Sequence, residues 1–440
     1  MKLKEQNNCR DVPREHSTGK ESFLDSLKES PISFWIDSSG GPSEHCNLSF
    51  YGTNLKYYLY GFLNEVNLYE CDSGAITFVN GNCFDFLEEK LNEEKKNKNG
   101  IFVGYFSYDL FQRGKKNNYP DFFFAYFDDV QDMGQNVIAR SKETLHATSP
   151  QQSRSGYVDA MEIASPLARN DVSCKHLTSN ITDSEYLEKV RLIKDEIKAG
   201  NVYQVNLTRE YSIEQSDIDE LAIYLKLRDA SPNPYGCFFK TPFVSILSSS
   251  PEEFLFVKDG YIRTRPIKGT LPKYELNIDL KNQAENIMIV DLERNDLGRV
   301  CEYGSIIAKK LLDIESYKHL NHVVSTIEGK LRANINLKEI FMALFPSGSI
   351  TGAPKIAAMK IIDKIEPTKR GAYTGSFGYI RTDGTMNFNI LIRTMFIHNN
   401  KITFNVGGGI VADSEPESEL EEIRLKAKGI MSTLGIKAPC

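Results

Sequence analysis

The segment RTRPIKGT, residues 263–270, places Lys268 between an isoleucine and a glycine at the end of an expected strand. A neutral lysine amine is a nucleophile, whereas a charged lysine is an ordinary surface cation. The neutral form requires that burial or a nearby cation lower the pKa of the amine from its usual value of about 10.4. Lys268 alone does not decide between these two interpretations.

A carboxylate is expected to face Lys268. Asp259-Gly260 is a strong signal for a two-residue hairpin turn between two apolar runs. The register of that hairpin sets Glu252 almost opposite Lys268, where the two strands open. One interpretation is a cross-strand ion pair, which contributes at most about 1 kcal/mol at a surface. The other is a general acid and a nucleophile that face one pocket.

A third carboxylate, Glu285, lies in a helix expected over 282–298, among mostly apolar positions. A carboxylate in such a stretch needs a partner or solvent. Arg294 and Arg299 could supply an ion pair on the same helix. A cation shared with acids from another helix is the alternative.

Glu419 and Glu422 are three residues apart in a final helix expected from about 416, so they share one face. Acids near the start of a helix often only complement its dipole. Alternatively, acids from two helices jointly hold Mg²⁺, which takes one or two carboxylates and completes its shell with water and an anionic substrate.

Two glycine-rich segments could bind an anion. Gly407, Gly408 and Gly409 end an expected strand before the last helix, so the backbone there could approach a substrate carboxylate and donate N–H groups. The loop PSGSITGAPK, residues 346–355, precedes an apolar helix but lacks the spacing of a P-loop. Most such loops are only turns.

The composition predicts a cytoplasmic protein of mixed α/β class. The 440 residues are 41% hydrophobic, which suffices for a large core. A net charge of −6 argues against a nucleic-acid partner. The 8 cysteines form no CxxC pair, so zinc and a disulfide framework are poorly supported and a reducing compartment is expected. No apolar run indicates a secretory signal or a membrane span.

The sequence pattern divides the chain into four regions. Residues 1–30 are expected to be a polar, frayed extension, and residues 31–132 are rich in short strands. Residues 133–182 are rich in Ser, Asn and Gln and are expected to be a linker or crossover. Residues 183–440 alternate long helices and strands and are expected to be the catalytic region. The helix that opens this last region begins with a capping-box pattern at Thr182.

Together these motifs resemble the chorismate-utilising enzymes. The resemblance covers nearly all of residues 32–435, through NVYQVNLTR, SSSPEEF, PIKGT, AENIMIVDLERNDLGRV, HVVSTIEG, FPSGSITGAPK, RGAYTGSFGYI, NILIRT and GGGIVADSEPESELEE in that order. It implies the fold of that family, an α/β (α+β) sandwich like that of anthranilate synthase component I. In that fold two mostly antiparallel β-sheets are flanked by helices, and the site lies between the halves.

Two positions distinguish the reactions of the family. Anthranilate synthases typically read PIAGT where this chain reads PIKGT, and the lysine version resembles component I of aminodeoxychorismate synthase, a transaminase-type transferase of 4-aminobenzoate and folate biosynthesis. Isochorismate and salicylate synthases carry a water-activating lysine at the position of Gln204, and glutamine cannot act as that base. The alternative functions are anthranilate synthase component I and a non-catalytic scaffold that binds chorismate or tryptophan for a glutaminase.

The resemblance also implies roles for single residues. Lys268 would attack carbon 2 of the chorismate ring while Glu252 protonates the leaving 4-hydroxyl, and ammonia would then add at carbon 4. Glu285 and Glu422 match Mg²⁺ ligands, with Glu419 nearby. The matching substrate-binding positions are Gln204, Thr270, His322, Ser349, Tyr373, Arg393, Gly407, Gly408 and Gly409.

The resemblance implies two further ligands. Ammonia would come from a separate glutamine amidotransferase subunit, because the nearest match to a glutaminase nucleophile elbow, around Cys83, lacks the last glycine. The segment FWIDSS resembles a tryptophan-binding segment of the family, which implies a site at Ser38. Whether tryptophan binds there, and whether it regulates, is left open by the sequence.

Some positions depart from the pattern of the family. Glu253 stands where Arg or Gln is common, and KNQAEN replaces KDRAEN. The segment between PIKGT and AEN is shorter than usual, which affects the loop expected over the site. None of these departures changes a residue with an expected catalytic role.

Overall fold

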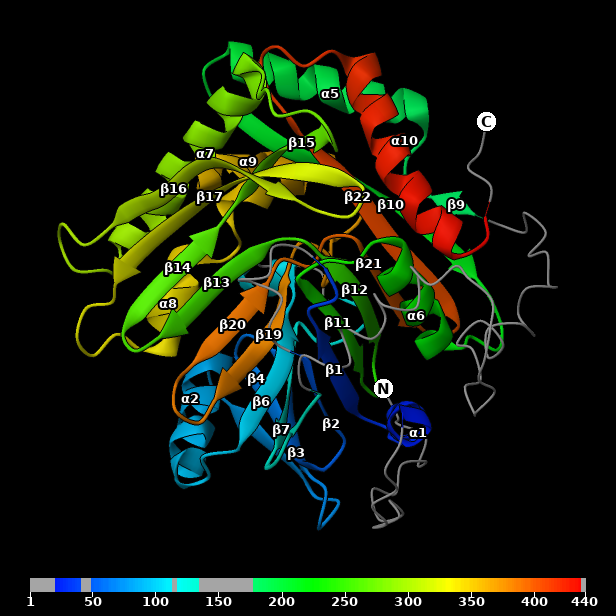
Figure 1. The fold of residues 1–440 in the computed structure, drawn as a ribbon, viewed down its shortest axis with the longest axis vertical. Coiled ribbons are helices and arrows are strands. Elements are labelled where there is room, and N and C mark those ends of the chain that lie inside the picture. Colours follow the sequence, from blue (N-terminus) through cyan, green and yellow to red (C-terminus); the bar gives the residue numbers. More distant parts are fainter. Residues whose placement is uncertain (1–19, 41–48, 113–116, 134–176, 437–440) are drawn as a thin grey trace, which may run out of the picture.

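Two antiparallel sheets form the centre of the molecule (Figure 1). The computed structural model describes residues 20–40, 49–112, 117–133 and 177–436. The first sheet has ten strands in the order β18-β10-β22-β21-β12-β11-β1-β2-β8, with β9 paired to β10. Its strands are β1 (Ser33–Asp37), β2 (Ser49–Gly52), β8 (Gln131–Asp132), β9 (Thr178–Ser179), β10 (Gln204–Glu214), β11 (Tyr235–Lys240), β12 (Ser245–Ser250), β18 (Gly352–Ala353), β21 (Thr394–His398) and β22 (Lys401–Ile410).

The second sheet has twelve strands in the order β15-β17-β14-β13-β20-β19-β6-β7-β3-β4-β5, with β16 paired to β17. Its strands are β3 (Leu55–Phe62), β4 (Glu65–Glu70), β5 (Ile76–Asn80), β6 (Ile101–Phe106), β7 (Phe122–Phe127), β13 (Glu253–Lys258), β14 (Tyr261–Arg265), β15 (Ile267–Pro272), β16 (Ile307–Ser316), β17 (Leu320–Lys330), β19 (Ser376–Arg381) and β20 (Met386–Asn389).

The α-helices of the described chain cover the outer faces of the two sheets. Side chains of α5, α6, α9 and α10 pack against the ten-stranded sheet, and those of α2, α7 and α8 pack against the twelve-stranded sheet. The helices are α1 (Lys20–Glu29), α2 (Cys83–Glu93), α5 (Asp183–Lys198), α6 (Glu220–Ala230), α7 (Leu280–Gly298), α8 (Leu337–Leu344), α9 (Lys355–Ile365) and α10 (Pro416–Thr433). In the described part of the chain, no helix combines the length and apolar character that a membrane crossing needs.

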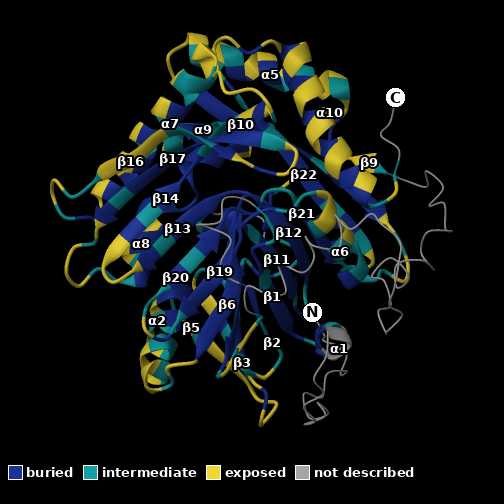
Figure 2. Ribbon diagram, in the orientation of Figure 1, coloured by how far each residue is buried: buried dark blue, intermediate teal, exposed yellow. Residues whose placement is uncertain are grey.

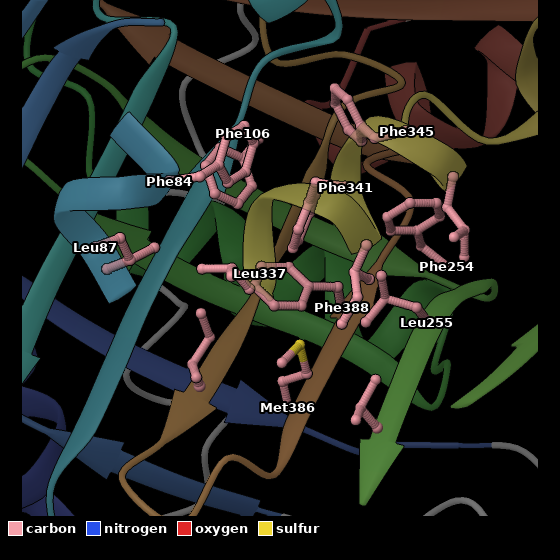
Figure 3. Close-up of a cluster of buried hydrophobic side chains, with 14 of the residues drawn as sticks. Phe84, Leu87, Phe106, Phe254, Leu255, Leu337, Phe341, Phe345, Met386 and Phe388 are labelled. Carbon is pink, nitrogen blue, oxygen red and sulfur yellow. The ribbon is translucent and has the colours of Figure 1, made fainter. Parts of the chain in front are cut away.

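Three buried apolar clusters hold these layers together. Along β1, Phe34 lies in the cluster between the sheets and Trp35 lies in the cluster under the helices, because successive strand residues point to opposite faces. The third cluster lies between the twelve-stranded sheet and its helices, where Phe84, Phe341 and Phe388 meet (Figure 3). Figure 2 shows that most strands are buried, while exposed residues gather on helices and turns. The expected fold class, a two-sheet sandwich flanked by helices, is confirmed.

Local signals predicted several elements correctly. The Thr182 side chain caps α5, and Glu185 completes the reciprocal capping box. Asp259 and Gly260 both have positive φ, 51° and 77°, as a tight hairpin turn between β13 and β14 requires. The sequence Ser414-x-x-Glu417 also predicts a capping box, here at the start of α10, but that prediction is wrong, because the Ser414 hydroxyl accepts the Val411 N–H instead.

Both sheets combine strands from the two strand-rich regions of the sequence. β1 pairs with β11, and β6 pairs with β19. Most of the expected linker, residues 134–176, lies outside the described residues. The expectation of a frayed start up to residue 30 is corrected at α1, where Phe23 and Leu27 lie one helical turn apart and are both buried.

Candidate active site

Lys268 and Glu252 approach each other where the β13–β14 hairpin ends. The two strands pair as far as Glu253 and Arg265, with an irregular register between Glu253 and Phe256. The chain then continues into β15, which pairs with β17 rather than with β13. The two residues are therefore not a cross-strand pair, but the backbone N–H next to Lys268 is close enough to the Glu252 carboxylate to donate to it, at 3.2 Å.

The Lys268 amine is half-buried and is bound by an uncharged group. Its Nζ donates a hydrogen bond to the backbone carbonyl of Ser349 at 2.8 Å. Burial lowers the pKa of Lys268 below its usual value, although the nearby carboxylates of Glu252 and Glu285 act in the opposite direction. This environment favours the neutral amine more than a surface site does.

Glu252 is 3% exposed and lies directly before β13. Burial raises the pKa of Glu252 to about 7, although the positive charge of Lys268 and hydrogen bonds from the Ser349 side chain and the Ile267 N–H lower it. A carboxylic acid with a pKa close to neutrality holds a proton that it can donate near pH 7.

The three acids expected to bind a metal lie on α7 and α10, near enough for the charges of Glu419 and Glu422 to act on Glu285. A Cβ atom added at Gly408 would lie 3.4 Å from Glu419 Oε2 and 3.9 Å from Glu422 Oε1, so both carboxylates lie over this glycine. Burial raises the pKa of Glu285, and the negative charges of Glu419 and Glu422 raise it further. The same-helix ion pair considered for Glu285 is not the one that forms, because Arg294 pairs with Asp291 at 3.1 Å.

Two lysines lie beside these acids. Lys426 Nζ is 2.7 Å from Glu422 Oε1, and Lys281 Nζ is 3.5 Å from Glu419 Oε1. Partial burial acts to raise the pKa of Glu422, but the contact with Lys426 outweighs it and lowers the pKa. Within the described residues, no three His, Cys, Asp or Glu side chains are grouped as a metal site would need. A set of carboxylate oxygens nevertheless fits Mg²⁺, which needs only one or two protein carboxylates beside substrate and water.

His322 joins two of the expected substrate-binding residues. Its Nδ1 lies 3.2 Å from Thr270 Oγ1, and its Nε2 lies 3.4 Å from a terminal nitrogen of Arg393. Burial, with the Arg393 guanidinium beside the ring, lowers the pKa of His322 to about 3. The ring is therefore neutral at pH 7. Because Arg393 can only donate, the tautomer with the proton on Nδ1 satisfies both contacts. Arg393 itself has a φ of 51°, which is unusual for a residue with a side chain.

Gln204 lies against the glycine segment of β22. Asn206 of β10 pairs with Gly409, and a Cβ atom added at Gly409 would lie 2.0 Å from Gln204 Nε2. Only glycine therefore fits under this amide without movement. Gln204 is 1% exposed, and its Oε1 atom has no protein hydrogen-bond partner among the described residues. Gly407 is held from the other side, where Lys426 Nζ donates to its carbonyl at 2.9 Å.

Two expected site residues lie apart from these contacts. Tyr373 is buried in the cluster between the sheets, and the residue after it, Thr374, has a φ of 56°. Ser38 is buried, and its hydroxyl donates to the carbonyl of Pro234 at 2.8 Å. Ser38 lines a separate small pocket with residues of β11, β19 and β20, including Tyr235.

Glu293, which was not predicted as a site residue, holds the loop that carries Ser349. Glu293 is fully buried, and its Oε1 accepts hydrogen bonds from Ser347 Oγ at 2.9 Å and from the Gly348 N–H at 3.0 Å. Its signal was present, because Glu293 lies in the same mostly apolar helical stretch as Glu285.

Comparisons with known proteins agree with the motifs. Residues 46–432 match the model of the chorismate binding enzyme family. The chloroplastic aminodeoxychorismate synthase of Arabidopsis thaliana is 33% identical over 90% of this chain, which spans 49% of that protein. Aminodeoxychorismate synthase component 1 of Escherichia coli is 41% identical over 58% of this chain and 59% of its own length. Anthranilate synthase component 1 of Acinetobacter calcoaceticus is 31% identical over 88% of both chains.

The fold has solved counterparts as well. The crystal structure of anthranilate synthase component I from Streptococcus pneumoniae aligns with a TM-score of 0.66 at 22% identity, covering 97% of this chain and 95% of that one. This likeness concerns the fold, which is the two-sheet arrangement described above. With a family match that spans most of the sequence, the chain belongs to the chorismate binding enzyme family.

Proposed function

We propose that this chain converts chorismate and ammonia to 4-amino-4-deoxychorismate, the reaction of an aminodeoxychorismate synthase. The observation that carries the proposal is the placement of Lys268 beside Glu252, with its amine bound to the Ser349 carbonyl. The names of several relatives support it, including component 1 of Bacillus subtilis at 33% identity over 80% of both chains.

The proposed reaction uses Lys268 and Glu252 in sequence. The neutral Lys268 amine attacks carbon 2 of the ring, and Glu252 gives its proton to the 4-hydroxyl, which leaves as water. The electron pairs shift across the ring and leave a covalent secondary ammonium at carbon 2. Ammonia then adds at carbon 4 and expels the lysine as a neutral amine. The new ammonium group returns a proton to Glu252, so both residues regain their starting states.

The remaining residues hold the anionic substrate. Glu285 and Glu422, with Glu419 nearby, would hold Mg²⁺, which supplies positive charge for the ring carboxylate. Arg393 and the backbone around Gly408 would bind the enolpyruvyl carboxylate. Such fixed charges and donors need no rearrangement during the reaction, which makes them effective in catalysis.

Gln204, Thr270, His322, Ser349 and Tyr373 would complete the substrate pocket. The orphaned Gln204 Oε1 supports this assignment, because a buried acceptor without a protein partner is expected to bind a donor from ligand or water. His322 is neutral, so its part is to orient the Thr270 hydroxyl and Arg393 rather than to carry charge.

We also propose two further ligands for the chain. A separate glutamine amidotransferase subunit would supply ammonia, which the "component 1" in the names of several relatives supports. The pocket at Ser38 would bind tryptophan, with the neighbouring aromatic ring of Tyr379 as one wall. The product would then enter 4-aminobenzoate and folate biosynthesis in the cytoplasm.

Anthranilate synthase component I is the second candidate function. It is supported by the Acinetobacter calcoaceticus relative, which aligns over 88% of both chains. The residue that argues against it is Lys268, since this candidate reaction requires no amine nucleophile from the enzyme.

Product identity tests the proposal. The purified chain is given chorismate, Mg²⁺ and ammonium, with and without an added aminodeoxychorismate lyase, and the products are analysed by mass spectrometry. We expect 4-aminobenzoate only when the lyase is present. Anthranilate formed without the lyase would replace the proposal with the second candidate. Binding of chorismate without any turnover would indicate a non-catalytic scaffold.

A further inference from the structure

Two ion pairs with buried carboxylates lie next to the strand ends that carry the proposed catalytic pair. Glu253 is 1% exposed and accepts two hydrogen bonds from the Arg263 guanidinium, at 2.8 and 2.9 Å. Arg265 is 2% exposed and forms an ion pair with Glu315, which is 5% exposed. Each positive charge is matched by a carboxylate, so the group as a whole is neutral. Neither pair belongs to the residues assigned to the reaction above.

The Tyr235 hydroxyl joins the two pairs. It lies 3.1 Å from Glu253 Oε2 and 2.9 Å from Arg265 NH1. Because a guanidinium only donates and an ionised carboxylate only accepts, the hydroxyl must accept from Arg265 and donate to Glu253. The directions of both hydrogen bonds of the Tyr235 hydroxyl are therefore fixed. These two hydrogen bonds connect the two ion pairs into one network.

One end of this network reaches the strand ends that carry the proposed catalytic pair. Glu253 follows Glu252 directly in the chain, and Arg265 precedes by two residues Ile267, whose N–H donates to the Glu252 carboxylate. Lys268 comes next. The distance between Glu253 and Arg265 therefore determines the relative position of Glu252 and Lys268.

The other end reaches the substrate-binding group at His322. Tyr317 donates its hydroxyl proton to Glu315 Oε2 at 3.3 Å, and its ring packs edge-on against the His322 ring with the centroids 4.9 Å apart. Glu315 also lies directly opposite His322 in the β16–β17 pairing. His322 in turn contacts Arg393.

We propose that Tyr235 is a positioning residue for the reaction, because its hydroxyl couples the Glu253–Arg263 and Arg265–Glu315 pairs and so fixes Glu252, Lys268 and His322 relative to one another. The inference rests on the proposed function. Tyr235 touches neither the reacting atoms nor the residues that would bind the substrate. It acts only through the geometry of its charged partners.

Stability alone is a poor explanation for this network. A buried ion pair gains little over well-packed apolar residues, because both charges must be taken out of water. A network in which all members have partners does, however, select one arrangement of the groups attached to it. A displacement of about 1 Å at a reacting centre lowers a rate by about a hundredfold, so an arrangement of this kind has catalytic value.

The test compares Tyr235→Phe with a matched control, Tyr224→Phe. Tyr224 is also buried, and its hydroxyl also contacts a buried ion pair, that of Asp37 and Arg228, 3.4 Å from Asp37 Oδ2. Steady-state kinetics with chorismate and ammonium, the pH profile of kcat/KM and thermal unfolding are measured for both variants and for the unaltered chain.

We expect Tyr235→Phe to lower kcat by about tenfold or more, with KM changed less than kcat, and to move the pH profile. Tyr224→Phe should keep kcat and the profile, at a similar loss of thermal stability. If Tyr235→Phe matches its control in kcat and in pH profile, the inference is overturned. If the unaltered chain itself does not make the product, the proposed function fails instead.

Glu315→Gln provides a second route to the same answer if Tyr235→Phe does not fold. The amide keeps the shape of Glu315 but removes the charge that holds Arg265. We expect the same signature, a lower kcat with a shifted pH profile. A Glu315→Gln variant with unaltered kcat and profile would overturn the inference independently.

Discussion

Lys268 Nζ donates to the backbone carbonyl of Ser349 at 2.8 Å, so a neutral oxygen rather than a carboxylate binds this amine directly. A carboxylate partner would hold the proton on the lysine more strongly. The Ser349 side chain also hydrogen-bonds Glu252. One residue thus contacts both members of the proposed catalytic pair, and Glu293 fixes the loop on which it lies.

Replacing Lys268 tests the nucleophile. Lys268→Ala should lower kcat by about 10³-fold or more while leaving chorismate binding measurable, because the covalent route is lost and the metal and arginine contacts remain. Rates are followed by the lyase-coupled assay and binding by calorimetry. Lys258→Ala, an exposed lysine on the same hairpin, is the control and should retain full activity. Equal activity of the two variants would exclude Lys268 as the nucleophile.

The pH dependence of kcat/KM tests the general acid. Glu252 must be protonated to act, and burial raises its pKa to about 7, so the fraction of Glu252 that can donate a proton falls as the pH rises through 7 and should produce an alkaline limb. Lys268 must be neutral, so activity should also fall at acidic pH, with a limb displaced below the usual range of lysine. In Glu252→Gln the residual activity should be about 10²- to 10⁴-fold lower and should lack the alkaline limb. An alkaline limb that persists in this variant would assign it to another group.

The same carboxyl group should make stability depend on pH. The folded pKa of Glu252 is raised from 4.5 to about 7, so the folded state binds the proton more tightly than the unfolded state does. Its contribution is therefore present at low pH and is lost as the pH rises from about 4.5 to 7, by up to about 3 kcal/mol. Urea titrations at pH 5 and pH 8 give the free energy of unfolding of Glu252→Gln and of the unaltered chain. From pH 5 to pH 8 the glutamine variant should become more stable relative to the unaltered chain. A difference that does not change with pH would contradict this.

The close approach of Gln204 to Gly409 can be tested by a double-mutant cycle. Gly409→Ala should destabilise the fold by about 1–3 kcal/mol, because the new methyl group overlaps Gln204 Nε2. Adding Gln204→Ala should restore part of this stability, since the overlapping amide is gone, but should not restore activity. Gly429→Ala is the control: a Cβ there meets nothing within 4 Å, and alanine in the middle of α10 should stabilise by about 0.5–1 kcal/mol. Additive effects of the first two changes would show that the overlap has no energetic consequence.

Metal dependence tests the cluster of acids. Turnover should stop in EDTA and return with added Mg²⁺, and Glu422→Gln should raise the Mg²⁺ concentration needed for half-maximal activity by about 10-fold or more. Calorimetric titration of Mg²⁺ into the chain with chorismate present gives a second readout that does not need turnover. Glu421→Gln, an exposed acid of the same helix that pairs with Arg424, should leave the Mg²⁺ requirement unchanged. Turnover that survives EDTA would remove the metal from the proposal.

Local sequence patterns predicted the elements of the proposed site better than their contacts. The hairpin at Asp259-Gly260 is specified by two adjacent residues, so the turn predicted that the strand ends carrying Glu252 and Lys268 meet, but not that the two residues do not pair across the strands. The contact of the Gln204 side chain with Gly409 could not, because it depends on the register of β10 against a strand far along the chain. Such registers follow from the whole sheet rather than from a local signal.

The buried polar network was equally beyond a pattern-based inference. Arg265 and Glu315 each look like ordinary charged residues of a strand, and nothing near either one indicates the other. Their burial results from the packing of β14, β16 and β17 side by side. Resemblance to a family supplied the expected roles of single residues, but not this network, since Glu253 itself departs from the usual residue at its position.

The pairing of β10 with β22 joins two strands that are synthesised at different times. Val205 lies opposite Ile410, so β10 is made long before its neighbour in the sheet. At about 5–20 residues per second, the ribosome needs on the order of 10–40 seconds to bridge that interval. During that time β10 has an open edge, which is a hazard for wrong pairing with other chains. The acids of α10 emerge later still, so no nascent chain that stops before α10 can assemble the proposed site. Translation speed and chaperone access should therefore affect the yield of active protein.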